Sequence, residues 1–250
     1  MNKTVLITGA TSGIGKACAE IFAKNNYNII ITGRREGHLA SVKKELEYKY
    51  NATITTLCFD VQSNEAVSKA IASLPTNTIV DILINNAGLA LGKDAFDVAD
   101  MQDWETMLQT NVNGLLYTTR ALMPFLKISK GHIINIGSIA GKEVYENGNV
   151  YCASKHAVDA LTKAMRIDLL KHQIKVTAIH PGATETEFSL VRFKADEAKA
   201  ALAYQGYNPL YAYDIANAVF YCSTLPKHVC VNELTIMCTA QANATTFLKQ

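Results

Sequence analysis

The sequence has little charge and no hydrophobic run of membrane-spanning length. Only 18% of its 250 residues are charged and the net charge is +2, with Lys and Arg spread along the chain. A nucleic-acid partner would require a dense basic stripe that faces the phosphates. A membrane span would require about 18 consecutive apolar residues, and the apolar start in MNKTVLITGA is too short for a signal peptide. We therefore expect a cytoplasmic protein that binds neither nucleic acid nor membranes.

The cysteine and histidine patterns of metal and redox sites are also missing. None of the six cysteines forms a C-x-x-C pair, and none of the six histidines belongs to an H-E-x-x-H pair. The spacing therefore predicts no metal site and no redox motif. We interpret the cysteines as buried free thiols, which suits a reducing compartment; they are Cys18, Cys58, Cys152, Cys222, Cys230 and Cys238.

Apolar residues make up 49% of the chain and recur in short runs. Most runs are continuous rather than alternating, which is typical of strands buried on both faces of a parallel sheet. The segments between them have helical length, for example residues 13–26, 38–50 and 64–74. This alternation, without a linker, predicts one α/β domain over residues 1–250: a Rossmann-type, doubly wound parallel sheet with helices on both faces. About seven strands are expected, at residues 4–8, 28–32, 53–60, 80–86, 131–137, 175–181 and 233–237.

Residues 183–210 interrupt this rhythm. They follow Pro181-Gly182 and contain charged and aromatic residues without a strand pattern. Long irregular segments on a regular scaffold often carry function. We interpret residues 183–210 as a mobile lid over a binding site.

A glycine-rich turn, TGATSGIGKA, follows the first expected strand and opens a helix. Gly9, Gly13 and Gly15 would let the backbone approach a pyrophosphate at the positive end of that helix. The alternative is a tight structural turn, but the position between strand and helix is the one that a dinucleotide site requires. The intervening residues expected at the cofactor are Thr11, Ser12 and Ile14.

The second strand ends in TGRR, which places Arg34 and Arg35 where an NAD enzyme carries an acid for the ribose 2′-hydroxyl. Two guanidiniums would bind a 2′-phosphate, which indicates NADP(H); the alternative is an exposed basic loop. Asp60 and Val61 end the third strand, where the adenine edge would lie. The turn after the fourth strand, within NNAG, would line the cofactor with the backbone of Asn86, Ala87 and Gly88.

A tyrosine and a lysine stand four residues apart in YCASK, at Tyr151 and Lys155. In a helix this spacing places them on one face. An ammonium beside a phenol lowers the pKa of the phenol, which would suit proton transfer to or from a substrate oxygen. The same spacing also arises by chance on solvated helices. Cys152 and His156 face other sides of the helix and are interpreted as packing residues.

In order and spacing, TGATSGIG, NNAG, Asn111, Ser138 and YCASK resemble the short-chain dehydrogenase/reductase family over essentially the whole chain. Within that family, NNAGLALG, DWETM, GHIINIGSIAG, GNVY and EFSLVRFK resemble the NADP-dependent 3-hydroxy acid dehydrogenases, which act on serine and L-allo-threonine. One departure is His180, where that subgroup often has an acidic residue before Pro-Gly. The resemblance implies an NADP-dependent oxidoreductase with a small-molecule substrate, assembled as a homotetramer.

The resemblance also implies a role for each matched residue. Tyr151 would be the general acid in reduction and the general base in oxidation. Lys155, together with the positive charge of the oxidised nicotinamide, would lower the pKa of Tyr151, and Lys155 would also hold the nicotinamide ribose. Ser138 would donate to the substrate oxygen, and Asn111 would hold a water that links Lys155 to solvent. The residues that would close over the nicotinamide are Pro181 and Gly182; Thr186 would bond its carboxamide, and Thr184 would also contact the cofactor.

Arg192, in the lid segment, is expected to bind the substrate carboxylate through two parallel hydrogen bonds, with Lys194 as a weaker candidate. The alternative is a salt bridge from Arg192 to Glu185, Glu187 or a neighbouring subunit. Two other functions stay open: the same chemistry on a bulkier carbonyl, and a non-catalytic NADP-binding regulator with the same fold.

Overall fold

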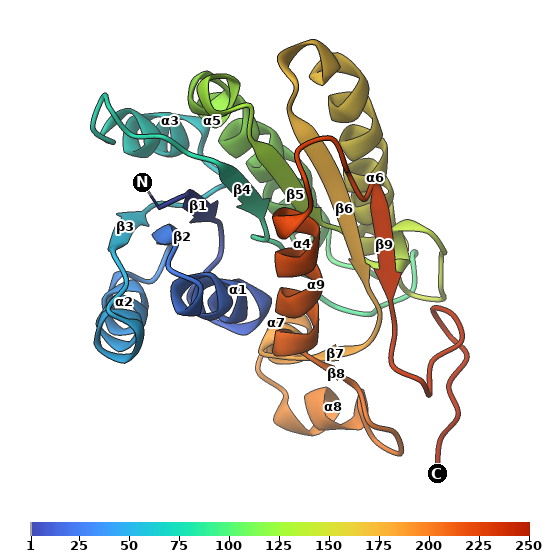
Figure 1. Cartoon of the computed structure of the whole chain (residues 1–250). Coiled ribbons are helices and arrows are strands. Elements are labelled where there is room, and N and C mark those ends of the chain that lie inside the picture. The colour runs from blue at the N-terminus through green and yellow to red at the C-terminus, as the bar shows by residue number, and fades with distance from the viewer. Residues whose placement is uncertain (1) are drawn as a thin grey trace.

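The computed structural model describes residues 2–250 and contains a seven-stranded sheet in which every pair of neighbouring strands is parallel (Figure 1). Its strand order is β3-β2-β1-β4-β5-β6-β9, which confirms the doubly wound Rossmann-type fold. The expected strands differ from the observed ones by at most two residues at either end. They are β1 (Thr4–Ile7), β2 (Asn28–Gly33), β3 (Ile54–Cys58), β4 (Ile82–Asn85), β5 (His132–Ile136), β6 (Lys175–Pro181) and β9 (Glu233–Ile236).

Helices cover both faces of this sheet. Successive strand side chains point to opposite faces, so Val5 and Ile7 pack in one core cluster and Leu6 in the other. Burial on both faces explains why the strand runs are continuous hydrophobics. One face carries α1 (Gly13–Lys24), α2 (Glu36–Tyr50) and α9 (Ala212–Thr224), and the other carries α3 (Asn64–Ala72), α5 (Gly114–Ser129) and α6 (Asn149–Asp168), with α4 (Met101–Leu108) beside α6.

The segment interpreted as a lid is more regular than the sequence indicated. The expectation that it lacks strands is wrong, because β7 (Thr184–Glu185) pairs in parallel with β8 (Leu210–Tyr211). Between them lie two short helices, α7 (Phe188–Arg192) and α8 (Glu197–Leu202), at the lower end of the view in Figure 1. Strands of two residues are too short to leave a recognisable pattern in the sequence.

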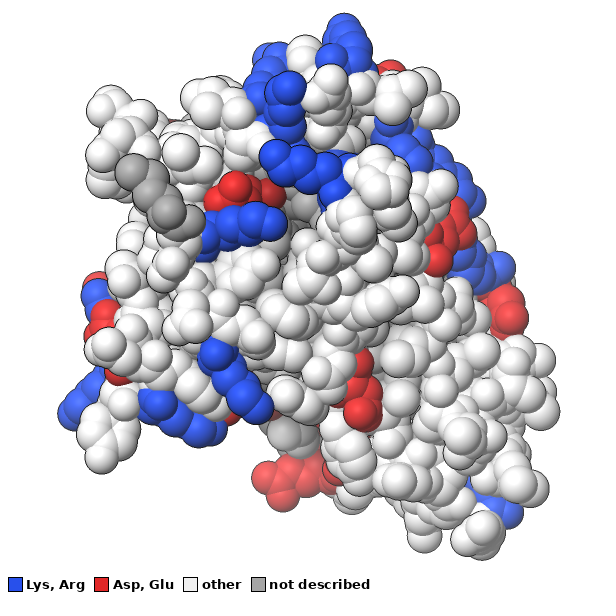
Figure 2. All heavy atoms as spheres, in the orientation of Figure 1, with Lys and Arg blue, Asp and Glu red and all other residues white. Residues whose placement is uncertain are grey.

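The surface carries its charges in small groups. On the face shown in Figure 2, Lys and Arg are interspersed with Asp and Glu and separated by uncharged surface. No helix within residues 2–250 combines the length and the hydropathy that a membrane span requires. All six cysteines are free and four of them are buried. The interpretation as buried thiols is wrong for Cys58, which is exposed at the end of β3.

Candidate active site

The glycine-rich turn has the backbone conformation that only glycine adopts without strain. Gly9 and Gly13 have φ of +65° and +53°, in the left-handed region. Gly15 is required for a different reason: it lets the first turn of α1 lie against the Gly9 backbone, because a Cβ there would lie 2.3 Å from the Gly9 carbonyl oxygen. Asn86 Nδ2 donates to the carbonyl oxygens of Thr8 and Gly9, at 2.9 and 3.1 Å. The turn after β4 thus holds the turn after β1 beside the N-terminus of α1.

A cleft of about 990 Å³ opens at the carboxyl ends of the strands. Every residue predicted to contact the cofactor lines it except Gly15, and so do Ser138, Tyr151 and Arg192. Asn111 does not line it. The left-handed glycines, the helix N-terminus and a cleft at the upper end of the usual size range together fit a dinucleotide.

Arg34 and Arg35 both line the cleft, and each is already paired with a carboxylate. Arg34 Nη1 lies 3.4 Å from Asp60 Oδ2. Arg35 Nη2 donates to Thr11 Oγ1 at 2.9 Å and lies 3.3 Å from Glu187 Oε2. Both guanidiniums are about half exposed. A phosphate that binds here therefore competes with Asp60 and Glu187.

Ser138, Tyr151 and Lys155 come together at the inner end of the cleft. Ser138 follows β5 and begins a short 3₁₀ turn (Ile139–Gly141), where its Oγ accepts from the Ala140 amide at 3.1 Å. It also lies close enough to the Tyr151 phenol to lower the pKa of that group. Tyr151 and Lys155 lie one helical turn apart on α6, and Lys155 Nζ donates to the Ile136 carbonyl at 3.0 Å. The three side chains predicted from the motif are therefore neighbours.

Burial dominates the ionisation of this site. It raises the pKa of the Tyr151 phenol to about 12, against the smaller lowering effects of Arg192 and Ser138. Burial lowers the pKa of Lys155 to about 8. In this structure the Lys155 ammonium donates to the Ile136 carbonyl, and burial has the largest effect on the pKa of Tyr151. That Lys155 and the positive charge of an oxidised nicotinamide together lower this pKa stays a prediction.

Asn111 lies in a π-helical segment, Gln109–Asn113, between α4 and α5. Its Oδ1 accepts from the Leu89 amide at 2.8 Å, and its Nδ2 donates to the Leu89 carbonyl at 2.8 Å and to Ser154 Oγ at 3.0 Å. Both N–H groups of the side chain are thus engaged. A water that Asn111 holds for Lys155 would therefore have to donate to its Oδ1 or to its backbone carbonyl.

Pro181, the last residue of β6, and Gly182, which follows it, line the cleft. Gln241, which sequence reasoning missed, holds this turn: its Oε1 accepts from the Ala183 amide at 2.8 Å, and a Cβ on Gly182 would lie 2.2 Å from that oxygen. Thr184 Oγ1 donates to the Gly182 carbonyl at 3.1 Å, and Thr186 faces Gly13 across the cleft. No sequence signal identifies Gln241, because it lies beyond the last strand.

Arg192 lies over the ring of Tyr151. Its Cζ is 4.9 Å from the Tyr151 ring centroid and 5.6 Å from that of Phe188, and its Nη2 donates to Tyr145 Oη at 2.6 Å. Its Nε is buried without a hydrogen-bond partner among the described residues. Sequence reasoning missed the roles of Tyr145, which belongs to no motif, and of Phe188, which lies in EFSLVRFK but was given no role.

The alternative partners of Arg192 within the chain are occupied elsewhere or distant. Glu187 pairs with Arg35, and no ion pair joins Arg192 to Glu185 or Glu187 within residues 2–250. Lys194 is the weaker candidate for binding the substrate carboxylate. Its Nζ lies 2.9 Å from Asp103 Oδ2, so its ammonium is already paired with a carboxylate of the protein.

Comparison with known proteins agrees with this geometry. Residues 3–197 match the family model for short chain dehydrogenases. The chain is 43% identical over 243 residues to the NADP-dependent 3-hydroxy acid dehydrogenase YdfG of Salmonella typhi, covering 96% of each chain. It is 44% identical over 245 residues to a sulfoacetaldehyde reductase of Chromohalobacter salexigens, covering 97% and 96%.

A solved structure of the closed form of serine dehydrogenase complexed with NADP⁺ superimposes with a TM-score of 0.91 at 43% identity, covering 99% of both chains. The residues of the cleft, the order of the sheet and these similarities agree along the length of the chain. The chain therefore belongs to the short-chain dehydrogenase family, and it is an oxidoreductase rather than a non-catalytic binding protein.

Proposed function

We propose that this NADP-dependent dehydrogenase interconverts small 3-hydroxy acids, of the serine, allo-threonine or 3-hydroxyisobutyrate type, with the corresponding 3-oxo acids or semialdehydes. One observation carries the proposal: the guanidinium of Arg192 lies beside Tyr151 without a carboxylate partner among residues 2–250. Arg192 is partly buried, and its Nε is buried without a hydrogen-bond partner among the described residues. Removing a cation from water without a counter-ion is costly. A substrate carboxylate would supply that counter-ion and be oriented by the planar guanidinium.

The relatives support an anionic substrate. Their names refer to 3-hydroxy acids, to serine and to sulfoacetaldehyde. Each of these compounds is small and carries a carboxylate or a sulfonate close to the reacting carbon. One guanidinium at the position of Arg192 can bind either kind of anion, because both present two oxygens in a plane.

The residues that would hold the cofactor lie along the cleft. The backbone of the Gly9–Gly15 turn and the N-terminus of α1 would bind the pyrophosphate, and Arg34 and Arg35 would bind the 2′-phosphate in place of their present carboxylates. Asp60 and Val61 would lie at the adenine. The remaining contacts would come from Asn86, Ala87, Gly88, Pro181, Gly182, Thr184 and Thr186.

The chain's own groups would handle the substrate oxygen. When bound, NADPH supplies a hydride and NADP⁺ accepts one. The Tyr151 hydroxyl would donate its proton to the substrate oxygen in reduction and regain it in oxidation. Ser138, which lines the same part of the cleft as Tyr151, would donate to the same oxygen as negative charge develops. Lys155 would add positive charge to the buried site and favour the phenolate after transfer.

The test of the substrate class is kinetic. Arg192→Leu should raise KM for serine and for 3-hydroxyisobutyrate at least about tenfold, a loss of roughly 1.4 kcal/mol. It should leave a neutral alcohol of similar size nearly unchanged, because that substrate has no anion to lose. Lys194→Leu is the matched control, since its ammonium pairs with Asp103. If acids and neutral alcohols are affected alike, Arg192 is structural and the assignment to hydroxy acids is refuted.

The lid and the assembly are part of the same proposal. Residues 183–210 carry Arg192 and Phe188 to the Tyr151 ring, so we expect this segment to order further over bound substrate. Hydrogen exchange of residues 183–210 should slow when NADP⁺ and a hydroxy acid are both present. The homotetramer stays a prediction from family resemblance, and light scattering on the purified protein tests it.

A further inference from the structure

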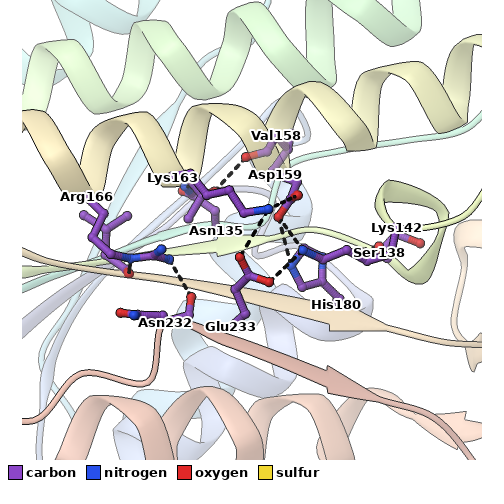
Figure 3. Close-up of polar contacts among 12 residues, drawn as sticks. Asn135, Ser138, Lys142, Val158, Asp159, Lys163, Arg166, His180, Asn232 and Glu233 are labelled. Carbon is purple, nitrogen blue, oxygen red and sulfur yellow. Dashed lines mark hydrogen bonds and ion pairs between the residues drawn. The ribbon is translucent and has the colours of Figure 1, made fainter.

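Five ionisable side chains meet behind Ser138, on the side away from the cleft, and we call them the His180 cluster (Figure 3). They come from four segments of the chain that are distant in sequence. His180 lies at the end of β6, and Lys142 follows the 3₁₀ turn after Ser138. The other members are Asp159 and Lys163 on α6 and Glu233 at the start of β9.

The charges within the cluster are balanced. Lys142 Nζ lies 2.7 Å from Asp159 Oδ1 and 2.7 Å from Glu233 Oε2. Lys163 Nζ lies 2.8 Å from Asp159 Oδ2 and 3.5 Å from Glu233 Oε1. Although Asp159, His180 and Glu233 are close enough to ligate a metal, the Lys142 ammonium fills the position between the two carboxylates. The cluster is therefore a closed ion network that surrounds His180.

His180 is the member whose hydrogen bonding is incomplete. Its ring is fully buried, with Nδ1 3.3 Å from the Ser138 carbonyl oxygen and Nε2 3.5 Å from Asp159 Oδ1. Nε2 has no hydrogen-bond partner within residues 2–250. A neutral imidazole has only one N–H, and the geometry assigns it to Nδ1, which donates to Ser138. The lone pair of Nε2 then faces a carboxylate.

The ring also packs directly on the backbone that carries Ser138. A Cβ on Gly137 would lie 2.5 Å from His180 Nδ1, so only glycine fits beneath the ring. The Gly137 amide donates to the Ile179 carbonyl at 2.7 Å, which ties the end of β5 to the residue before His180. A shift of this ring would therefore move the Ser138 peptide, whose side chain lines the cleft together with Tyr151 and lowers the pKa of its phenol.

We propose that His180 is a positioning residue for the reaction: its Nδ1–H holds the Ser138 carbonyl, and protonation of Nε2 draws the ring toward Asp159 and displaces the Ser138 hydroxyl from Tyr151. The proposal rests on the proposed role of Ser138 toward the substrate oxygen. It does not depend on Arg192, because Ser138 would serve acidic and neutral substrates alike.

The direction of the pH effect follows from the groups that face His180. Burial and the Lys142 ammonium hold the pKa of His180 below its ordinary 6.5, while Asp159, the Ser138 carbonyl and Glu233 act in the opposite direction. Lys163 adds positive charge next to Asp159. The ring is therefore neutral at pH 7, and kcat should fall as the pH drops below about 6.5.

Two amide substitutions at His180 distinguish the hydrogen bond that Nδ1–H donates to Ser138 from the packing of the ring. His180→Asn keeps an N–H near the position of Nδ1, and His180→Gln moves the N–H toward the position of Nε2. We expect kcat of His180→Asn to exceed that of His180→Gln about five- to tenfold, the scale of one hydrogen bond, with the same NADP⁺ affinity in both. The acid limb of the kcat profile should be absent in both variants. Equal kcat values, or an acid limb that persists in His180→Asn, would overturn the proposal.

A third variant and a control keep the test independent of how well the His180 variants fold. Asp159→Asn removes a group that raises the pKa of His180, so the acid limb should move to lower pH. His156→Gln, on the same helix, should keep the limb, because His156 contacts the Cys152 carbonyl and not the cluster. Each effect should be equal for a 3-hydroxy acid and a neutral alcohol. A limb that Asp159→Asn leaves unmoved, or that His156→Gln removes, would contradict the assignment to His180.

Discussion

Replacement of Arg34 or Arg35 by alanine should weaken NADP⁺ binding far more than NAD⁺ binding. A charge-assisted hydrogen bond to a phosphate is worth about 1.5–3 kcal/mol. When the phosphate binds, each guanidinium gives up its present half-exposed ion pair with Asp60 or Glu187. Such a pair is worth about 0.2–1 kcal/mol, which is subtracted from the gain. The net loss is then roughly 0.5–2.8 kcal/mol per arginine, or about 2- to 100-fold in affinity.

The carboxylate that now pairs with Arg35 allows a second test of the same prediction. Glu187→Gln removes the charge that competes with a phosphate for Arg35, so NADP⁺ should bind about two- to fivefold more tightly, which corresponds to one exposed ion pair. NAD⁺ should not respond, because it lacks the 2′-phosphate. Glu185→Gln is the matched control, since Glu185 makes no ion pair within the described residues.

Isothermal titration calorimetry of the four variants with NADP⁺ and NAD⁺ provides the measurement. The result expected for each arginine variant is a large rise in Kd for NADP⁺ and a change below about twofold for NAD⁺. If both arginine variants lose the two cofactors equally, Arg34 and Arg35 shape the loop without binding the phosphate, and the reasoning from the TGRR motif is refuted.

Three further predictions concern catalysis, cofactor binding and stability. Tyr151→Phe should lower turnover at least about 100-fold, followed by NADPH absorbance, with NADP⁺ affinity kept; normal turnover would contradict the acid–base role. Because the pKa of Lys155 is about 8, NADP⁺ affinity should fall above pH 8 in the native enzyme but stay flat in Lys155→Met, as measured by calorimetry. Burial lowers the pKa of His132 to about 3, so the unfolded state binds more protons between pH 6.5 and pH 3 and stability falls as the pH drops through that range. Urea unfolding should show a loss of about 2–3 kcal/mol between pH 7 and pH 4.5 that His132→Gln, which can keep the bond to Thr177, does not show.

Much of the scaffold could be predicted because its signals are local. Continuous hydrophobic runs marked most of the seven main strands, since burial on both faces requires apolar side chains at successive positions. The edge strands β3 and β9 are only partly buried and include threonines. The glycines of the first turn predicted a close approach of the backbone to a pyrophosphate. Gly9 and Gly13 have the left-handed backbone that other residues adopt only with strain. Tyr151 and Lys155 shared a helix face because their spacing matches one helical turn.

Other features carry no local signal. Gln241 holds the Gly182 turn from beyond the last strand, and Tyr145 contacts Arg192 from a segment that the sequence did not connect with it. The π-helical turn at Asn111 is likewise invisible to periodicity, because one extra residue in a helix leaves the apolar pattern almost unchanged.

The sequence by itself determined the succession of strands and helices along the chain, the glycine-rich turn and the positions of the candidate catalytic side chains, because each follows from backbone preference, from spacing along one element or from a motif shared with the family. Only the tertiary structure decided how deeply these and other site side chains are buried and which charged groups lie beside them. It buried Tyr151, which raises the pKa of its phenol, it paired Arg35 with Glu187 across the cleft, and it enclosed His180 behind Ser138. The physical reason is that desolvation and ion pairing depend on distances between segments far apart in the chain, which no local pattern encodes.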